Sequence, residues 1–187
     1  MNTKTKKLST VSIVLCGMFA ALVAIGAFIQ IPVPYMDYFT LQFFFVLLAG
    51  LILGADKGAI SVGCYVLLGL VGVPIFAAGG GIGYIFRPSF GYLVGFIVSA
   101  YVTGKVCEKL KASYNNYLLA CLAGFVVTYA IGIVYKFIIL NFYAHTPATL
   151  GVIFLSCFPL DMPGDFVLCL LAAGVGLRMR KSGFYLS

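Results

Sequence analysis

Five charged residues interrupt the apolar segments of this 187-residue sequence in a way that could hold a small polar molecule. They are Asp37, Arg87, Lys136, Asp161 and Asp165. Charged groups inside or near a bilayer are costly, so their presence is informative. Both signs occur on segments far apart in the sequence, so these groups must converge on one another or on a ligand. Two interpretations follow: a network of ion pairs that holds loops together, or a pocket for a small polar solute.

A glycine cluster and several aromatic residues close to Arg87 favour the pocket. Gly79, Gly80, Gly81 and Gly83 leave a loop without side chains, so that its backbone can approach a ligand closely. The aromatic residues that would supply apolar walls are Phe76, Tyr84, Phe90 and Tyr92, with Tyr35 and Tyr38 earlier in the chain. The glycines match neither G-x-G-x-x-G nor the P-loop pattern, so they indicate no nucleotide site.

The sequence carries no pattern of a catalytic or cofactor site. The single histidine, His145, cannot supply a pair of haem ligands, and no Ser–His–acid arrangement or metal-ligand spacing occurs. The six cysteines are scattered through apolar runs without a C-x-x-C pair, which is typical of small buried hydrophobic side chains. We therefore expect no enzymatic activity, no metal and no cofactor.

The composition requires a lipid environment for most of the chain. Hydrophobic types make up 63% of the residues and charged types 9%, whereas a soluble domain has about 25% charged residues. A soluble core of this length could not bury so much apolar surface, because a folded domain of about 150 residues still exposes roughly a third of its unfolded surface. This excludes a soluble globular protein, a disordered chain and, despite the net charge of +7, a nucleic-acid binder.

The windows between charges predict six transmembrane helices, since a span needs about 20 apolar residues. These helices cover residues 9–29, 39–55, 58–73, 89–107, 116–141 and 153–178, with the middle ones short and the last one interrupted. The N-terminal lysines and the apolar run after them resemble a signal peptide, but the run is too long and has no clear cleavage site, so we expect a retained helix. The predicted fold is a single all-α integral membrane domain over residues 1–187.

The basic residues predict the orientation of this domain. With six spans, ten of the twelve Lys and Arg residues fall on the same side as both termini. The positive-inside rule places that side in the cytoplasm. Loops 30–38, 74–88 and 142–152 are then expected outside, where the five charged residues described above also gather.

The first predicted helix carries a face of small residues. Gly17 and Ala21, and likewise Ala20 and Ala24, are four positions apart. Such faces let helices approach closely in a membrane. The face either packs within this chain or docks onto another membrane subunit, and the two interpretations are compatible.

An ordered set of motifs resembles the BioY family. The motifs are FTLQF at residues 39–43, LAGLILG at 48–54, YxxxGLxGxPxF at 65–76, the glycines at 79–83, RPSFGYLVGF at 87–96 and FPxxxPGD at 158–165. BioY proteins are the biotin-specific substrate-binding (S) components of energy-coupling-factor (ECF) transporters. The resemblance implies a six-helix S-component fold in the plasma membrane of a prokaryote, and capture of biotin from outside. It also implies as partners a membrane coupling (T) subunit, met by the Ala20 and Ala24 face, and two ATPase subunits.

Two departures from the family pattern bear on the ligand. The usual G-P-T-G-G-Y is R-P-S-F-G-Y here, and Leu168 stands where the family often has a lysine, three residues after Asp165. The cation for the biotin carboxylate must then come from elsewhere. Lys136 and Arg87 are the candidates outside the cytoplasmic set, and the sequence does not decide between them.

The chemistry of biotin assigns roles to the remaining residues. We expect Asp165 to accept hydrogen bonds from the ureido N–H groups, and one of Tyr84, Gln42 or Asn141 to donate to the ureido carbonyl. The other expected contacts are Gly81, Gly83, Tyr92, Ser89, Phe76 and Asp161, with loop 74–88 covering the ligand. One alternative is a self-sufficient secondary transporter in which Asp165 or Asp161 carries a proton, and another is a purely structural membrane subunit.

Overall fold

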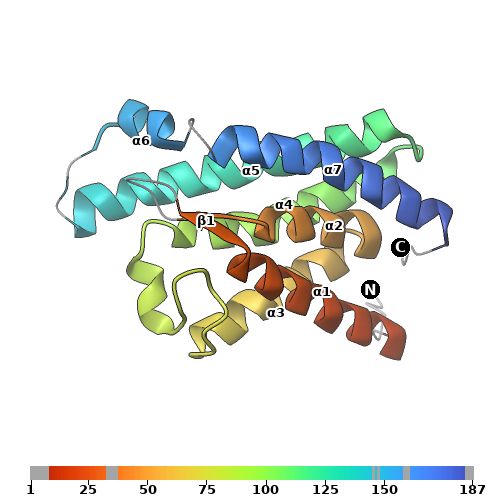
Figure 1. The fold of residues 1–187 in the computed structure, drawn as a ribbon, viewed down its shortest axis with the longest axis horizontal. Helices are drawn as coiled ribbons and strands as arrows, with labels where there is room; N and C mark the ends of the chain where they lie inside the picture. Colours follow the sequence, from red (N-terminus) through yellow and green to blue (C-terminus); the bar gives the residue numbers. More distant parts are fainter. Residues whose placement is uncertain (1–8, 33–37, 145, 147, 158–160, 184–187) are drawn as a thin grey trace, which may run out of the picture.

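The computed structural model of the chain describes residues 9–32, 38–144, 146, 148–157 and 161–183. Seven α-helices occur in this part of the chain and lie alongside one another (Figure 1). They are α1 (Thr10–Phe28), α2 (Gln42–Leu53), α3 (Ala55–Leu70), α4 (Phe90–Lys109), α5 (Tyr114–Ile138), α6 (Leu150–Cys157) and α7 (Asp161–Lys181). Three residues named above from the sequence lie outside the described residues: Tyr35, Asp37 and His145.

Four shorter elements lie between the helices. Strands β1 (Gln30–Pro32) and β2 (Tyr38–Thr40) pair antiparallel, with Gln30 opposite Thr40. A 3-10 turn, η1 (Ile82–Phe86), precedes α4, and a π-helical turn, η2 (Ile139–Tyr143), extends α5. The predicted all-α fold therefore has a small β-hairpin, and α2 begins at residue 42 instead of residue 39 because residues 38–40 pair with β1.

Within the part of the chain that the structure describes, four helical segments are long and apolar enough to cross a membrane. They are α1, α4, α7 and the segment Tyr114–Tyr143, which joins α5 and η2. Helices α2 and α3 are shorter, with 12 and 16 residues. Ten of the twelve α2 residues are buried, and α2 packs against α1, α3, α4 and α7. The apolar side chains of α2 are thus buried among the other helices and form part of the bundle interior.

The predicted sixth span, residues 153–178, is divided into two helices. α6 ends at Cys157, and α7 begins at Asp161 on the other side of the undescribed residues 158–160. Pro163 lies in the first turn of α7, where its missing N–H has no intrahelical partner to lose. A continuous helix through Pro163 would lose one backbone hydrogen bond and would clash with the preceding turn. The proline therefore favours a helix start at this point.

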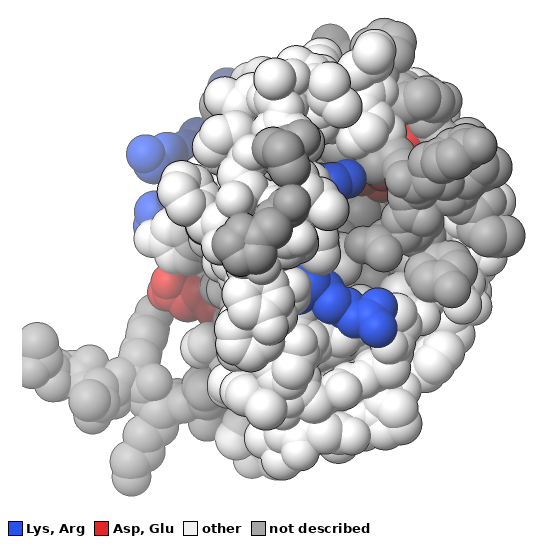
Figure 2. Space-filling model, turned by 90° about the vertical axis from the view of Figure 1, so that its left-hand side faces the viewer, with Lys and Arg blue, Asp and Glu red and all other residues white. Residues whose placement is uncertain are grey.

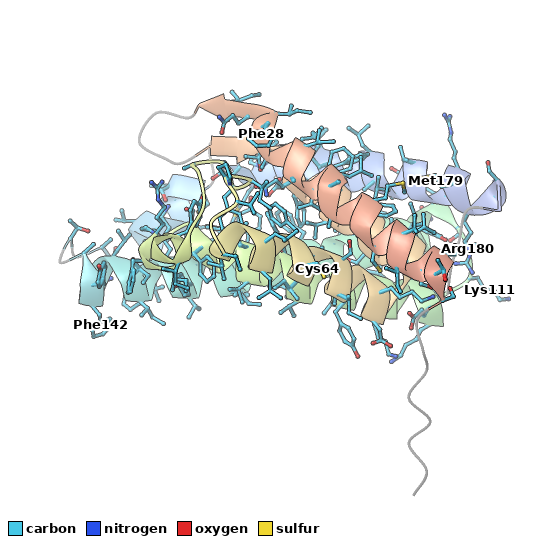
Figure 3. The ribbon with its side chains drawn as sticks, turned by 90° about the horizontal axis from the view of Figure 1, so that it is seen from below. Phe28, Cys64, Lys111, Phe142, Met179 and Arg180 are labelled. Carbon is cyan, nitrogen blue, oxygen red and sulfur yellow. The ribbon has the colours of Figure 1, made fainter. Side chains whose placement is uncertain are left out.

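The start of α1 and the end of α7 lie at the same end of the bundle (Figure 1). Lys111, Met179 and Arg180 also lie at this end, whereas Phe142 lies at the opposite one (Figure 3). The guanidinium of Arg180 donates to the Tyr117 hydroxyl at 3.0 Å, which links α7 to α5. The last turn of α7, at this end, carries Arg178, Arg180 and Lys181.

A carboxylate at this end fixes the start of α3. Gly54 connects α2 to α3 with a positive φ of 82°, which glycine tolerates without strain. The Glu108 carboxylate on α4 then accepts a hydrogen bond of 2.9 Å from the Ala55 N–H. Glu108 thus satisfies one of the backbone N–H groups that every helix start leaves without an intrahelical partner.

Candidate functional site

A cavity of about 100 Å³ lies near the end of the bundle opposite the start of α1 and the end of α7. It forms where α2, α4 and α7 begin and where α5 approaches its end. Its lining residues are Phe39, Thr40, Gln42, Phe43, Ala77, Ala78, Tyr84, Ser89, Tyr92, Leu93, Phe96, Tyr129, Lys136, Asp161 and Asp165. Figure 2 shows this end of the molecule, with a hollow in which acidic and basic atoms are visible together.

The acidic wall of the cavity comes from α7. Asp161 and Asp165 are four residues apart, so both project from one face of this helix. The Tyr129 hydroxyl on α5 donates a hydrogen bond of 2.8 Å to Oδ2 of Asp165. Among the described residues, Tyr129 is the side chain that donates to Asp165, so Oδ1 of this carboxylate is available to accept from a ligand.

The basic group on the cavity wall is Lys136, in the last turn of α5. Its Nζ donates to the Ser156 hydroxyl of α6 at 3.5 Å, and this hydroxyl donates to the Ile153 carbonyl at 2.7 Å. A side chain of α6 therefore contacts the ammonium group of this lysine. An ammonium group held in this way can bind a carboxylate that enters the cavity.

Arg87, the other candidate cation, does not line the cavity. Its side chain is exposed, and its guanidinium lies 5.2 Å from the centre of the Tyr84 ring in a cation–π arrangement. Tyr84 is itself a wall residue. The structure thus places Lys136 on the cavity wall and Arg87 behind an aromatic ring.

Two further polar groups of the wall can serve a neutral ligand. The Gln42 amide donates to the Tyr65 hydroxyl at 2.5 Å and accepts from the Thr40 hydroxyl at 3.2 Å. The Ser89 hydroxyl is buried and has no hydrogen-bond partner among the described residues. Because a buried hydroxyl without a partner is costly, Ser89 is suited to bind a ligand that enters the cavity.

The structure brings seven of the twelve predicted ligand-binding residues to one cavity. These are Asp165, Lys136, Tyr84, Gln42, Tyr92, Ser89 and Asp161. It places the other five, Arg87, Asn141, Gly81, Gly83 and Phe76, off the cavity wall. The amide of Asn141 donates to the carbonyls of Phe137 and Ala148 at 3.0 and 2.9 Å and accepts from the Ala148 N–H, so it stabilises the end of α5.

Phe76 and the glycines shape the loop beside the cavity. Phe76 is buried between Tyr65 and Tyr84, with ring centres 5.5 and 4.6 Å away. Gly81 has a φ of 101° and donates its N–H to the Gly69 carbonyl at 2.7 Å. These contacts turn the loop so that Ala77 and Ala78, instead of the glycines, reach the cavity. The glycines are therefore needed for backbone conformation.

Eight residues of the cavity wall were not predicted from the sequence: Phe39, Thr40, Phe43, Ala77, Ala78, Leu93, Phe96 and Tyr129. Helical spacing would have found some of them. Leu93 and Phe96 follow Ser89 by four and seven positions, which is one face of α4. Tyr129 precedes Lys136 by seven positions on α5. No local pattern points to Ala77 or Ala78, because their position depends on how the loop folds.

Comparisons with known proteins agree on one family. The BioY family model matches residues 1–183. A probable biotin transporter BioY of Lysinibacillus sphaericus is 39% identical over 177 residues, which cover 94% of this chain and 90% of that protein. The biotin transporter BioY of Thermotoga maritima is 39% identical over 169 residues, with 88% and 93% covered.

A solved structure has the same fold. The crystal structure of the S-component for biotin from an ECF-type ABC transporter superposes with a TM-score of 0.82 at 25% sequence identity. The match covers 99% of this chain and 97% of that one. The likeness therefore extends over the whole helical bundle, including the elements that form the cavity.

Proposed function

This chain belongs to the BioY family, and we propose that it is the biotin-binding S component of an ECF-type transporter. The observation that carries the proposal is the cavity itself. A carboxylate, an amide, an ammonium group and aromatic walls converge there from four different helices. Such a set suits a ligand that is part polar, part apolar and part anionic.

The wall groups match the three chemical parts of biotin. Asp165 has an oxygen that can accept from the ureido N–H groups, and a hydrogen bond to a charged group contributes about 1.5–3 kcal/mol. Gln42 or Tyr84 donates to the ureido carbonyl. Lys136 binds the tail carboxylate, and the apolar residues Phe43, Leu93 and Phe96 enclose the thiophane ring and the valeryl chain.

The orientation follows from the distribution of charge. The described cytoplasmic candidates are Lys57, Lys105, Lys109, Lys111, Arg178, Arg180 and Lys181, and the labelled ones among them lie at the end that holds the start of α1 (Figure 3). We assign this end to the cytoplasm of a prokaryotic cell by the positive-inside rule. The cavity then opens toward the outside, where biotin is captured.

An ECF-type transporter takes its energy from ATP hydrolysis, and the sequence of this chain contains no nucleotide-binding motif. We assign this role to a coupling subunit and two ATPases. The small-residue face of α1 is our candidate for docking, with one change from the sequence-based expectation. Ala20 is 7% exposed and packs inside the chain, and Ala24 is half-buried, whereas Gly17 and Ala21 are exposed. The flat outer part of α1 is therefore around Gly17 and Ala21.

Mass spectrometry of the ligand released from the purified, denatured protein tests the proposal. We expect biotin in a ratio near one per chain, and calorimetry on the ligand-free protein should show saturable biotin binding. Reconstituted alone in liposomes, the chain should bind biotin but not accumulate it. Accumulation by the chain alone that a protonophore stops would favour a secondary transporter, and the absence of any ligand would favour a structural subunit.

A further inference from the structure

A chain of three hydrogen bonds runs from the cavity wall to the neighbouring loop. Thr40 donates to Oε1 of Gln42 at 3.2 Å, and Nε2 of Gln42 donates to the Tyr65 hydroxyl at 2.5 Å. Tyr65 in turn donates to the Ile75 carbonyl at 3.1 Å. Thr40 and Gln42 line the cavity, whereas Tyr65 is fully buried behind them. This series of hydrogen bonds thus joins the Gln42 amide on the cavity wall to a backbone carbonyl of the loop.

The direction of this chain is set at its buried end. A carbonyl oxygen can only accept, so the single hydroxyl hydrogen of Tyr65 is committed to Ile75. The Tyr65 oxygen must then accept from Gln42, which requires the NH₂ side of the amide to face it. The two sides of a glutamine amide have nearly the same shape, so only its partners decide between them. In this protein the Ile75 carbonyl fixes the orientation of the Gln42 amide, because it orients the Tyr65 hydroxyl.

The carbonyl that sets this direction is firmly held. Phe76 and Gly79 exchange backbone hydrogen bonds of 2.9 and 3.1 Å directly after Ile75. Gly81 is tied to Gly69 of α3, and the Phe76 ring packs edge-on against Tyr65. The loop therefore holds the Ile75 carbonyl in one position. Because this carbonyl orients the Tyr65 hydroxyl, it also keeps the Gln42 amide in one orientation.

We propose that Tyr65 is a positioning residue for ligand specificity. It holds the Gln42 amide so that the second N–H of Nε2, and not the amide oxygen, is offered to the ligand. The site then selects a ligand whose ring carries a carbonyl acceptor and disfavours one that carries a donor in its place. This inference rests on the proposed function, in which the acceptor is the ureido carbonyl of biotin.

Two ligands that differ at this one group test the inference. 2-Iminobiotin carries a protonated imino group, a donor, in place of the ureido carbonyl. The ratio of the two dissociation constants is measured by calorimetry for the wild-type chain and for Tyr65→Phe. Without the Tyr65 hydroxyl, only Thr40 is left to hydrogen-bond to the Gln42 amide among these partners. The Thr40 hydroxyl can accept as well as donate, so it does not fix the orientation of the amide. The amide can then turn, so we expect the preference for biotin to fall by about tenfold.

Two variants separate positioning from a general loss of structure. Tyr135→Phe removes a comparable hydrogen bond, from a half-buried phenol to the Ile85 carbonyl, away from the cavity wall. Its ligand ratio should equal that of the wild type. In a Gln42→Leu background, Tyr65→Phe should cause no further change in the ratio, because Tyr65 acts through Gln42. If Tyr65→Phe does not fold, Gln42→Glu replaces the N–H offered to the ligand with an oxygen and should lower the preference in the same direction, and an unchanged ratio would overturn the inference.

The outcomes distinguish this inference from the proposed function. An unchanged ratio in folded Tyr65→Phe that still binds biotin overturns the positioning role and leaves the biotin site intact. The same holds if Tyr65→Phe shifts the ratio equally with and without Gln42. Failure of the wild-type chain to bind biotin would overturn both.

Discussion

Tyr129 on α5 donates a 2.8 Å hydrogen bond to Asp165 on α7, and both side chains line one cavity. Among the residues that the structure describes, the hydrogen-bond partner of this carboxylate is therefore a neutral phenol and not a lysine or arginine. A salt bridge would compete directly with a neutral ligand for the carboxylate. The phenol instead occupies one oxygen and leaves the other for an N–H donor, which suits the ureido group of biotin.

Removing the charge of this carboxylate should weaken binding. Asp165→Asn keeps the shape of the side chain but replaces a charged acceptor with a neutral amide, so we expect a loss of biotin affinity of at least tenfold. Calorimetry measures the affinity, and size-exclusion chromatography checks that the variant is folded. Asp56→Asn, which changes an exposed carboxylate on α3 outside the cavity, is the matched control. Equal affinities for both variants would exclude a ligand role for Asp165.

The two candidate cations can be separated by a ligand without a charged tail. Lys136→Met should weaken biotin binding by about 10- to 100-fold, because a charge-assisted hydrogen bond is lost. The binding of biotinamide, whose tail is neutral, should change by less than about threefold. Arg87→Met is the control, since the exposed guanidinium lies over Tyr84 and outside the cavity. The reverse result would make Arg87 the carboxylate anchor.

The loop beside the cavity depends on a glycine of α3. A Cβ at Gly69 would collide with the ring of Phe76, whereas a Cβ at Gly63 would meet nothing within 4 Å. Gly69→Ala should therefore displace loop 71–81, reduce biotin affinity and speed proteolysis of this loop. Gly63→Ala, on the same helix, should behave like the wild type. If Gly69→Ala binds biotin normally, the loop is not needed for the site.

The docking face of α1 predicts a separation of binding from transport. Ala21→Trp and Gly17→Trp add a bulky side chain to the exposed part of α1, so biotin binding should be retained. Uptake in liposomes that also contain the coupling and ATPase subunits should be lost. Ala20→Trp should instead lower stability, because Ala20 is buried. Normal uptake by both exposed variants would assign the partner contact to another helix.

Removing the Glu108 carboxylate, which lies on α4 and caps the start of α3, should change the stability of the protein but not its affinity for biotin. Glu108→Ala leaves the Ala55 N–H without its partner, so unfolding in detergent should become easier by about 1–2 kcal/mol. Lys105→Ala should have little effect, since the Lys105–Glu108 pair is 3.7 Å apart, partly exposed and of the surface type. Thermal denaturation measures both. Biotin affinity should be unchanged, because neither residue lines the cavity.

Much of the fold follows from local patterns in the sequence. The apolar windows predict α1, α4 and α5 to within a few residues, because hydropathy and helical period are properties of neighbouring residues. The division of the last span into α6 and α7 is less evident, although the prolines around it indicate an interruption. The β-hairpin depends on pairing between residues six to ten positions apart and has no such local signal.

The candidate site was predictable in its chemistry more than in its geometry. Asp165 and Lys136 stand out because charge is rare in an apolar chain, and both line the cavity. Arg87 and Asn141 also stand out because polar residues are rare in this chain. Arg87, however, lies over a tyrosine ring, and Asn141 stabilises a helix end. Polarity alone does not distinguish a ligand-binding group from one with a structural partner.

The sequence by itself determined that most of this protein is embedded in a lipid membrane, that its charged residues are few, and which family its motifs resemble. These are sums and spacings along the chain, and they need no contact between distant residues. Only the tertiary structure decided that Lys136 rather than Arg87 shares a cavity with Asp165, and that Ile75 sets the direction of the Gln42 amide through Tyr65. Such relations depend on how helices distant in sequence pack, because hydrogen bonds form across space regardless of distance along the chain.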